Sequence, residues 1–371
     1  MLCLLSPVMG YNNLNQLLAA YQIKSNNYYK LFNKLSLCDL SKLSIHLFKQ
    51  NLIEKLIELG KKSDSTWSRF SPTIIIDASI FKIWLKEQGF VLYDKFFSGQ
   101  TGKGEHGYKL TLAGIAISDT FYPLQFIIAS KKITDAEIAQ LLLESTHQFI
   151  ESIENEHELN FVKWYLSVDS GYSDSDLIAL ASRLKIDMIC VPNKTHLFMI
   201  NGIKTNMKKY IKEIFLPDEK EYYLENNKDT AEPFTMRIKA NYKSKGIDVV
   251  LLLFRLKDSK KVSVVYCIDL NIKQKTLRHR WFQRTYIEQY FRFCKHTLQI
   301  AASTYSDEYD FVRKIYLFFL KANFALQVRN DCRKRKGFKK ITFGTIRLLV
   351  SKNNLIDDWI IKLLNLERPF D

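Results

Sequence analysis

The pattern of hydrophobic and polar positions divides the chain into segments of different period. Between Asn12 and about Gly60, apolar residues recur at helical spacing in three stripes. From Thr73 onward the pattern changes to short apolar runs and alternating segments, separated by helical stretches that begin near Thr134 and Ser173. The succession of strand, hairpin, helix, strand, helix and strand predicts a mixed α/β sheet covered by helices on both faces.

Two of the short apolar runs carry an aspartate near their carboxyl end. Thr73–Ser79 reads TIIIDAS and Trp164–Ser170 reads WYLSVDS. We expect both to be buried strands, with Asp77 ending the first and Asp169 near the end of the second. If these strands lie side by side and parallel, both carboxylates emerge at the same edge of the sheet. The alternative is that Asp77 caps a helix or turn beginning near Ile80.

The other strand-like segments are a hairpin and an insertion. His106–Ser118 and Phe121–Ala129 are expected to pair as antiparallel strands joined through Asp119 and Thr120. Residues 193–271 alternate between Lys-rich polar stretches and strand-like runs, which predicts a β-rich insertion.

The stretch Trp281–Lys295 places a single carboxylate among cations. Four charged residues in it are spaced four, four and three apart, so they share one face if the stretch is helical: Arg284, Glu288, Arg292 and Lys295. In one interpretation Glu288 is an ordinary salt-bridge partner on a solvated helix. In the other, Glu288 binds a hard divalent cation while the cations around it hold phosphates.

Basic residues are concentrated in two parts of the chain. Arg280 extends the face just described, and residues 271–300 hold seven basic residues against Glu288 alone. Residues 321–340 form a second basic run, with Arg333, Lys334, Arg335 and Lys336 at its centre. The net charge of +16 favours nucleic acid as the partner. We expect the second run to lengthen the DNA track, although such a run can also be a solvated face.

Composition excludes several other classes. A content of 47% hydrophobic residues is enough for a large core and excludes a disordered chain. The longest apolar runs fall far short of the roughly 20 residues that a membrane span needs, and the N-terminal segment makes a poor signal peptide. Six scattered cysteines form no CxxC-type motif, so we expect reduced cysteines in a cytosolic protein.

Together these residues resemble the DDE transposases of bacterial insertion sequences. The resemblance is carried by the aspartate of IIIDAS, the aspartate of VDSGYSD, and Arg284, Glu288 and Lys295 at spacings of four and seven. More narrowly, the last three residues match three of the four signature positions of the insertion-sequence-four family. The fourth position holds Trp281, where that family has Tyr. The resemblance covers roughly residues 73–300.

The resemblance implies an RNase H-like core in which Asp77, Asp169 and Glu288 are catalytic and bind two Mg²⁺ ions, with Mn²⁺ as a substitute. Water would release a 3′-hydroxyl at the end of the element, and that hydroxyl would attack target DNA. The implied partner is double-stranded DNA, both the element ends and the target, bound by a homodimer assembled on that DNA. The implied location is the bacterial cytoplasm, in association with the nucleoid.

The resemblance also implies roles for the flanking residues. Arg284 and Lys295 would hold phosphates of the cleaved end, and Arg292 belongs to the same DNA-binding face. Trp281 could stack on a base or bind a phosphate, but packing of the helix is an equally open role. Two rival functions are another RNase H-like nuclease that cuts without joining, and a non-catalytic DNA-binding protein derived from a transposase.

The predicted domain organisation has five parts. They are a helical N-terminal region (1–70), the first part of the core (71–192), a β-rich insertion (193–272), the glutamate-bearing helix of the core (273–305) and a helical, basic C-terminal region (306–371). Two roles remain open for the N-terminal helices: one is to read DNA, and the other is packing or dimerisation. Asp248 and Asp269 lie among exposed-loop signals, so we do not expect them to bind metal.

Overall fold

The computed structural model describes residues 52–59, 71–82, 92–98, 101–130, 132–159, 161, 163–193, 195–226, 233–256, 259 and 261–297, and eight separate helical positions between 308 and 329. The chain forms two compact units. The first comprises Ile53–Ile80 and Tyr108–Gln289, and we call it the sheet unit. The second unit comprises Met1–Leu52, Phe81–Gly107 and Tyr290–Asp371.

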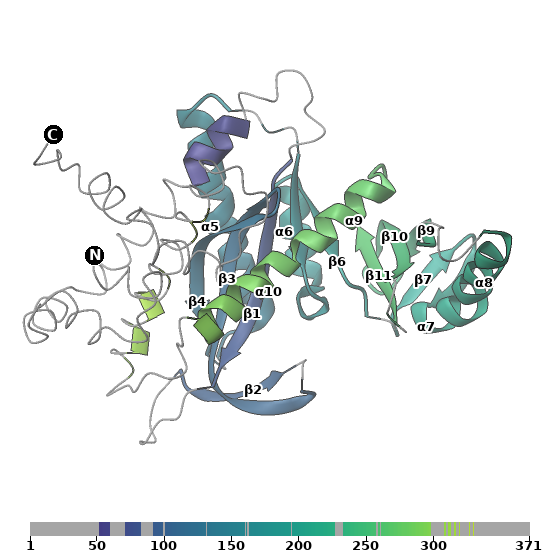
Figure 1. Ribbon diagram of the computed structural model, residues 1–371, viewed down its shortest axis with the longest axis horizontal. Helices are drawn as coiled ribbons and strands as arrows, with labels where there is room; N and C mark the ends of the chain where they lie inside the picture. The colour runs from purple at the N-terminus through teal and green to yellow at the C-terminus, as the bar shows by residue number, and fades with distance from the viewer. Residues whose placement is uncertain are drawn as a thin grey trace, which may run out of the picture. The chain divides into compact units, whose positions relative to one another are not determined.

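Groups of strands are separated by helices along the described chain (Figure 1). The strands are β1 (Thr73–Phe81), β2 (Asp94–Ser98), β3 (Lys103–Ile117), β4 (Thr120–Ile128), β5 (Trp164–Val168), β6 (Ile186–Cys190), β7 (Leu197–Ile200), β8 (Ile203–Asn206), β9 (Thr235–Tyr242), β10 (Ile247–Arg255) and β11 (Val262–Cys267). The α-helices are α5 (Asp135–Glu156), α6 (Ser175–Arg183), α7 (Met207–Tyr210), α8 (Leu216–Glu225), α9 (Gln274–Gln283) and α10 (Thr285–Arg292). Short turns of other helix types are η3 (Ser170–Tyr172), η4 (Ile211–Phe215) and η5 (Phe293–Thr297).

The strands of the sheet unit form one continuous sheet. Its order is β3-β1-β5-β6-β11-β10-β9-β7-β8, and β4 pairs with β3. Strands β1, β5 and β6 run parallel to one another, whereas β3 and β4, and all strands from β6 onward, pair antiparallel. In the second unit, β2 pairs with the first residues of β3. The mixed sheet with its helices confirms the predicted α/β class.

Helices cover both faces of the sheet, as predicted. Consecutive residues of a strand point to opposite faces. On β5, the indole of Trp164 donates a hydrogen bond to Glu154 of α5 (3.2 Å). The next residue, Tyr165, lies under the guanidinium of Arg280 on α9, 5.4 Å from its ring centre. Helices α5 and α9 therefore cover opposite faces of the strand that leads to Asp169.

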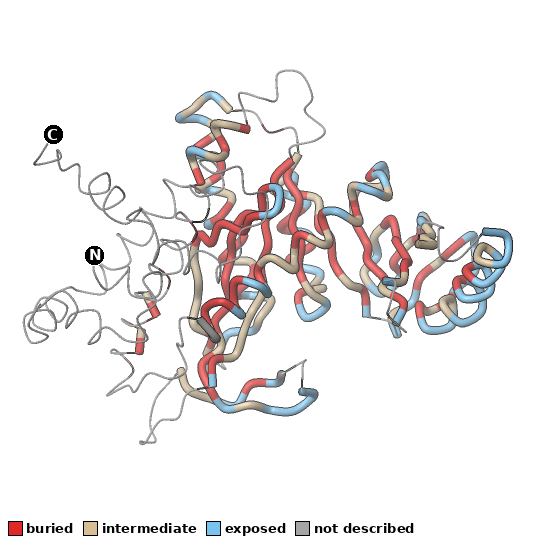
Figure 2. Tube along the Cα trace, viewed as in Figure 1, coloured by how far each residue is buried: buried red, intermediate tan, exposed pale blue. Residues whose placement is uncertain are grey.

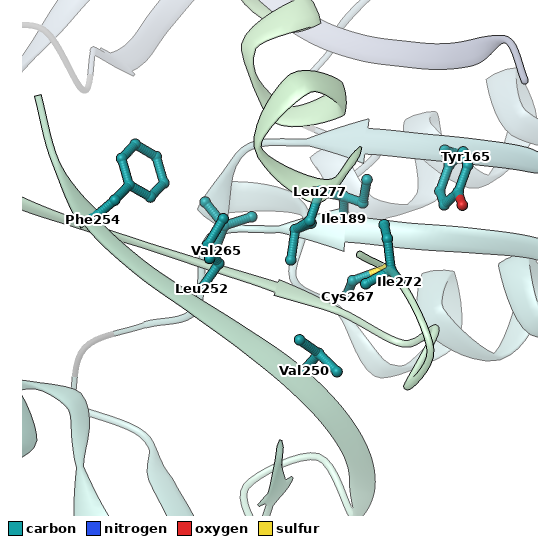
Figure 3. Close-up of a cluster of buried hydrophobic side chains, with 9 residues drawn as sticks. All are labelled: Tyr165, Ile189, Val250, Leu252, Phe254, Val265, Cys267, Ile272 and Leu277. Carbon is teal, nitrogen blue, oxygen red and sulfur yellow. The ribbon is translucent and has the colours of Figure 1, made fainter. Parts of the chain in front are cut away.

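A hydrophobic cluster joins the predicted core to the predicted insertion. Figure 3 shows side chains of β5, β6, β10 and β11 packed around Leu277 of α9 and Ile272 just before it. The central strands carry long runs of buried residues, whereas α8 is mostly exposed (Figure 2). Because β10 and β11 belong to residues 193–272, the insertion shares its packing with the strands and helix of the core. The five-part division of the chain stays a prediction.

Two sequence-based boundaries are wrong. Strand β1 does not end on Asp77 but continues to Phe81, so no helix or turn begins near Ile80. Its pairing with β5 stops at Ile76, but β1 also has a second neighbour in the sheet, the long strand β3. The β3–β4 hairpin forms as expected, but its turn residues are Ser118 and Asp119, and Thr120 already pairs with Ile117.

Several predictions concern residues that are only partly described. Residues 52–59 are helical, consistent with the last of the three N-terminal stripes, and the rest of that region lies outside the described residues. The basic run Arg333, Lys334, Arg335 and Lys336 also lies outside them. Within the described ranges, no helix is long and apolar enough to cross a membrane. Cys190, Cys267 and Cys294 are buried and reduced, as expected.

Candidate active site

Two of the predicted catalytic acids occupy adjacent places on parallel strands. The pairing of β1 with β5 ends with Ile76 opposite Val168. Asp77 and Asp169 each come directly after a residue of this last pair. Their backbones therefore lie beside one another on neighbouring strands. This is the arrangement expected from the sequence, although Asp77 lies within its strand and Asp169 just after its own.

Asp77 is a largely buried carboxylate. Its side chain is 16% exposed, and its Oδ1 accepts a hydrogen bond from the backbone N–H of Ala78 (2.8 Å). Burial raises the pKa of Asp77 from 3.8 to about 6, and the negative charges of Asp169 and Glu288 add to that rise. The guanidinium of Arg284 opposes it but does not cancel it. The site therefore holds more negative charge than its local cation compensates.

Asp169 is held by a loop with several anchors. Its Oδ1 accepts a hydrogen bond from the backbone N–H of Ser170 (2.8 Å), which starts the turn η3. The buried thiol of Cys190 donates to the Asp169 carbonyl (3.3 Å), and the Ser173 hydroxyl lies 3.1 Å from the hydroxyl of Tyr266 on β11. These contacts tie the loop to β6 and β11, so the neighbouring strands determine where Asp169 stands.

The predicted single helix around Glu288 is divided. Helix α9 ends at Gln283 and α10 begins at Thr285, with Arg284 between them. The N–H of Arg284 bonds the carbonyl of Trp281, and the N–H of Ile287 bonds the carbonyl of Arg284, so both bonds span three residues instead of four. The stretch is therefore not one unbroken helix, but Arg284 and Glu288 still lie on one face, four residues apart, and form an ion pair. Glu288 nevertheless remains one turn after Arg284, on the exposed side of α10.

Arg284 connects two of the three acids. Its Nη1 donates to Asp77 Oδ2 (3.2 Å), and its Nη2 lies 2.6 Å from Glu288 Oε1. The guanidinium also lies over the Trp281 ring, 4.8 Å from its centre. The salt bridge between Arg284 and Glu288 that the simpler interpretation predicts is thus present. The same guanidinium also bonds Asp77, which lies on a strand 207 residues earlier in the chain. Glu288 is therefore part of the same group of charges as Asp77.

A buried polar network fixes the junction between α9 and α10. The Thr73 hydroxyl donates to Gln283 Oε1 (2.7 Å), and Gln283 Nε2 donates to the Ser118 carbonyl (3.2 Å). Arg280 Nη1 lies 3.3 Å from both Thr73 Oγ1 and Gln283 Oε1. These contacts bind the last turn of α9 to β1 and to the β3–β4 turn. They explain why the helix divides here, because the anchored residues hold α9 in place just before Arg284.

The network also corrects the role expected of Arg280. This side chain is only 5% exposed and faces Tyr165 within the sheet unit, so it does not extend a DNA-binding face. Burial lowers the pKa of Arg280 to about 10. Nothing in its sequence context distinguishes it from its exposed neighbours.

The insertion also helps to position the glutamate-bearing helix. Arg237 of β9 donates to the carbonyls of Leu270 (2.9 Å) and Ile272 (3.1 Å), in the loop that leads into α9. Gln274, the first residue of α9, donates to the hydroxyl of Thr235 on β9. The sequence carried no signal for these residues, since each contact joins segments far apart in the chain.

The remaining predicted DNA-binding residues of this stretch have different surroundings. Trp281 is partly buried against the cluster of Figure 3, as well as lying under Arg284. Arg292 and Lys295 belong to the second unit, where Arg292 is exposed and the Lys295 ammonium lies 5.1 Å from the ring centre of Phe81. Burial lowers the pKa of Lys295. The sheet unit therefore unites the three acids with Arg284 and Trp281.

The three acids provide a donor set suited to a hard divalent cation. All their ligand atoms are carboxylate oxygens, which Mg²⁺ and Mn²⁺ prefer. Among the described residues, however, no three His, Cys, Asp or Glu side chains are gathered closely enough to hold a metal ion. Arg284 lies between the carboxylates of Asp77 and Glu288. The acids fit a divalent cation in their chemistry and in their charge, and the carboxylates of Asp77 and Glu288 are both bonded to the guanidinium of Arg284.

Comparison with protein families gives a match over most of the chain. The model described as a transposase DDE domain matches residues 68–324, which include all three acids. A search of curated proteins finds no match.

Two solved nuclease structures give distant likenesses. The chain is similar to a Ciona intestinalis endonuclease V variant in complex with inosine-containing DNA, with 10% identity, a TM-score of 0.29, and coverage of 61% of this chain and 84% of that one. It is also similar to the NurA nuclease of Sulfolobus solfataricus, with 11% identity, a TM-score of 0.28, and coverage of 78% and 96%. TM-scores this low carry no weight for fold or function.

Proposed function

Because the chain belongs to the family of transposase DDE domains, we propose that it cleaves DNA at the ends of an insertion sequence and joins the released 3′-hydroxyl to target DNA. Membership of that family makes it a metal-dependent enzyme that acts on DNA. The narrower assignment to the insertion-sequence-four family rests on Arg284, Glu288 and Lys295 at the family spacing, with Trp281 as the one departure.

The observation that carries the proposal is the meeting of three distant acids in one unit. Asp77 and Asp169 follow paired residues of two parallel strands, and Arg284 links Asp77 to Glu288. Burial raises the pKa of Asp77, and the negative charges of Asp169 and Glu288 add to that rise. Such an arrangement is costly for stability alone, whereas it suits residues that bind cations.

Asp77, Asp169 and Glu288 would hold the divalent cations, Mg²⁺ with Mn²⁺ as a substitute. When bound, two such cations activate the attacking oxygen and stabilise the leaving oxygen of a phosphoryl transfer. Arg284 offers a planar fork for a phosphate oxygen beside the acids. The buried network of Thr73, Gln283 and Arg280 keeps the start of α10 against β1, so Glu288 stays within reach of the strand acids.

The proposed partner is double-stranded DNA, both element ends and target. The net charge of +16 supports a polyanion, and Arg292, Lys295 and the run Arg333, Lys334, Arg335 and Lys336 would extend the DNA contacts beyond the acids. We propose a homodimer on DNA and a location at the bacterial nucleoid. Both proposals follow from the family's chemistry, in which two element ends are processed together.

The test is a strand-joining assay with the chain's own element ends as substrate. Individual replacement of Asp77, Asp169 or Glu288 by Ala should abolish cleavage and joining while leaving DNA binding intact. Asp248→Ala is the matched control, because Asp248 is an exposed acid that bonds Asn241 on the neighbouring strand. Cleavage that survives in any of the three variants, or in EDTA, would reject the site. Cleavage without joining in the unaltered protein would favour the rival nuclease.

A further inference from the structure

Arg284 occupies the place where the proposed site needs a cation. One of its nitrogens bonds Asp77 (3.2 Å) and another lies 2.6 Å from Glu288. Two of the three acids therefore already share a positive partner. In the part of the chain that the structure describes, the same acids are not gathered into a group that could hold a metal ion. The guanidinium bridge and a metal-binding arrangement are therefore alternatives.

The bridge is not a fully satisfied ion pair. The Nε of Arg284 is buried and has no hydrogen-bond partner among the described residues. An N–H group buried without an acceptor costs free energy, and the bridge leaves one donor of Arg284 unused, as is also the case for Arg255 and Arg280. By contrast, Lys163 is shared by Asp187 and Asp269 at 2.8 and 2.7 Å, with no unpartnered atom recorded for it.

The charges are also unevenly matched. Three carboxylates face one guanidinium, which leaves a formal excess of two negative charges. The buried position of Asp77 makes this excess costly, because charges interact more strongly away from water. A divalent cation brings twice the charge of Arg284 and prefers the same carboxylate oxygens. The acids therefore gain when the cation replaces the guanidinium.

We propose that Arg284 is an exchangeable counter-ion, which closes the site between Asp77 and Glu288 in the metal-free protein and is displaced when a divalent cation binds. The released guanidinium then becomes free to grip a DNA phosphate. Metal loading and phosphate binding are thereby coupled through one side chain. This inference rests on the proposed metal-dependent function and deepens it.

The experiment measures Mn²⁺ binding to the full chain without DNA, by titration calorimetry. Arg284→Ala should bind Mn²⁺ about tenfold more tightly than the unaltered protein, because the cation no longer displaces charge-assisted hydrogen bonds. Arg284→Gln, which keeps a polar side chain, should tighten binding in the same direction and serves if the Ala variant folds poorly. Equal or weaker binding in both variants would overturn the exchange.

Arg183→Ala is the matched control. Arg183 also pairs with a carboxylate, Glu144, at 3.3 Å, but both side chains are exposed. Its loss should leave the Mn²⁺ affinity unchanged, since exposed charges beyond about 10 Å are screened by salt. If Arg183→Ala tightened binding as much as Arg284→Ala, the effect would be one of net charge and the exchange would be rejected.

Thermal unfolding gives a second readout that does not depend on activity. Without metal, Arg284→Ala should melt below the unaltered protein, because the acids lose their only bonded cation among the described residues. Saturating Mg²⁺ should raise its melting temperature by more than it raises that of the unaltered protein. A smaller rise would contradict the exchange.

The outcomes separate the inference from the function on which it rests. If Asp77→Asn binds Mn²⁺ as well as the unaltered protein, the acids do not hold metal and the proposed function fails. If Mn²⁺ binding requires Asp77 but is unchanged in Arg284→Ala, the function stands and only the exchange fails.

Discussion

The sheet unit holds two clusters of acids at opposite ends of the same parallel strands. At the amino end of β5, the ammonium of Lys163 lies 2.8 Å from Asp187 and 2.7 Å from Asp269. We call these three residues the amino-end cluster. Burial opposes the charge of Lys163, but its hydrogen bonds to both acids raise its pKa above the usual value. Two acids against one lysine leave a formal charge of −1.

At the carboxyl end of β5 lies the carboxyl-end cluster, made of Asp77, Asp169, Glu288 and Arg284. Three acids against one arginine leave a formal charge of −2. Arg284 is bonded to two of the acids, and no ion pair to Asp169 is present among the described residues. Among the described residues, the carboxyl-end cluster therefore carries an excess of negative charge that no ion pair neutralises.

The comparison shows that a buried acid is not by itself a sign of a functional site. In the amino-end cluster each acid is bonded to the lysine, which leaves one negative charge in excess, and the acids tie together β5, β6 and the residues after β11. In the carboxyl-end cluster the charge is left over, and it lies at the end of parallel strands where ligands commonly bind. The amount of uncompensated charge distinguishes a candidate metal site from a structural ion pair.

The largest expected effect is on the rate of DNA cleavage, which should depend on the carboxyl-end cluster and not on the amino-end cluster. Asp77→Asn should lower the rate of DNA cleavage by about 10³-fold or more, because its carboxylate would hold the cations that stabilise the transition state. Asp187→Asn should leave the rate near that of the unaltered protein. Cleavage of labelled element ends, with circular dichroism to confirm folding, measures both. Equal losses in the two variants would remove the distinction between the clusters.

The next effect is on the pH dependence of stability without metal. The pKa of Asp77 rises from 3.8 to about 6 on folding, so the folded state binds more protons between those pH values. Stability should therefore fall as pH rises from about 4 to 6, by up to about 3 kcal/mol. Urea unfolding in EDTA measures this slope, which Asp77→Asn should flatten. An unchanged slope in that variant would show that Asp77 is not the group responsible.

A smaller loss of stability is expected from breaking the amino-end cluster. Lys163→Met leaves Asp187 and Asp269 without their shared cation, and burial already raises the pKa of Asp187. Because Lys163 is one-third exposed, we expect a loss of about 1 to 2 kcal/mol in the free energy of unfolding. Urea unfolding provides the measurement. Lys275→Met, at an exposed position of α9, should change stability little and controls for loss of a lysine.

The smallest effect concerns the aromatic platform under Arg284. Trp281→Leu keeps apolar bulk but removes a cation–π contact worth about 0.5 to 2 kcal/mol, so cleavage should fall several-fold. Trp281→Tyr, which restores the ring and the residue that the insertion-sequence-four family carries, should retain activity. Single-turnover cleavage rates compare the two. If the Trp281→Leu and Trp281→Tyr variants cleave DNA at equal rates, Trp281 acts only in packing.

The sequence predicted the elements that depend on local pattern. The capping of α5 by Thr134 and of α6 by Asp174 follows from residue type, because each side chain accepts a hydrogen bond from the first turn of its helix. The β3–β4 hairpin and the strand before Asp169 follow from runs of apolar residues. The sequence led only to the conditional expectation that Asp77 and Asp169 share an edge if their strands are parallel neighbours, and the pairing of β1 with β5 meets that condition.

What the sequence determined by itself is therefore the central strands, the β3–β4 hairpin, helices α5 and α6, the three candidate acids and the spacing of Arg284 and Glu288. Helices α7 and α8, within the predicted β-rich insertion, were not predicted. Only the tertiary structure decided that Arg284 bridges Asp77 and Glu288, that Arg280 is buried, and that the helix divides at Arg284. Arg280 and Arg284 are both arginines on one helical stretch, and their roles differ because of partners 207 residues away, Thr73 and Asp77. Local periodicity encodes which residues share a face, but the partner of a charged side chain depends on which strand the fold brings beneath it.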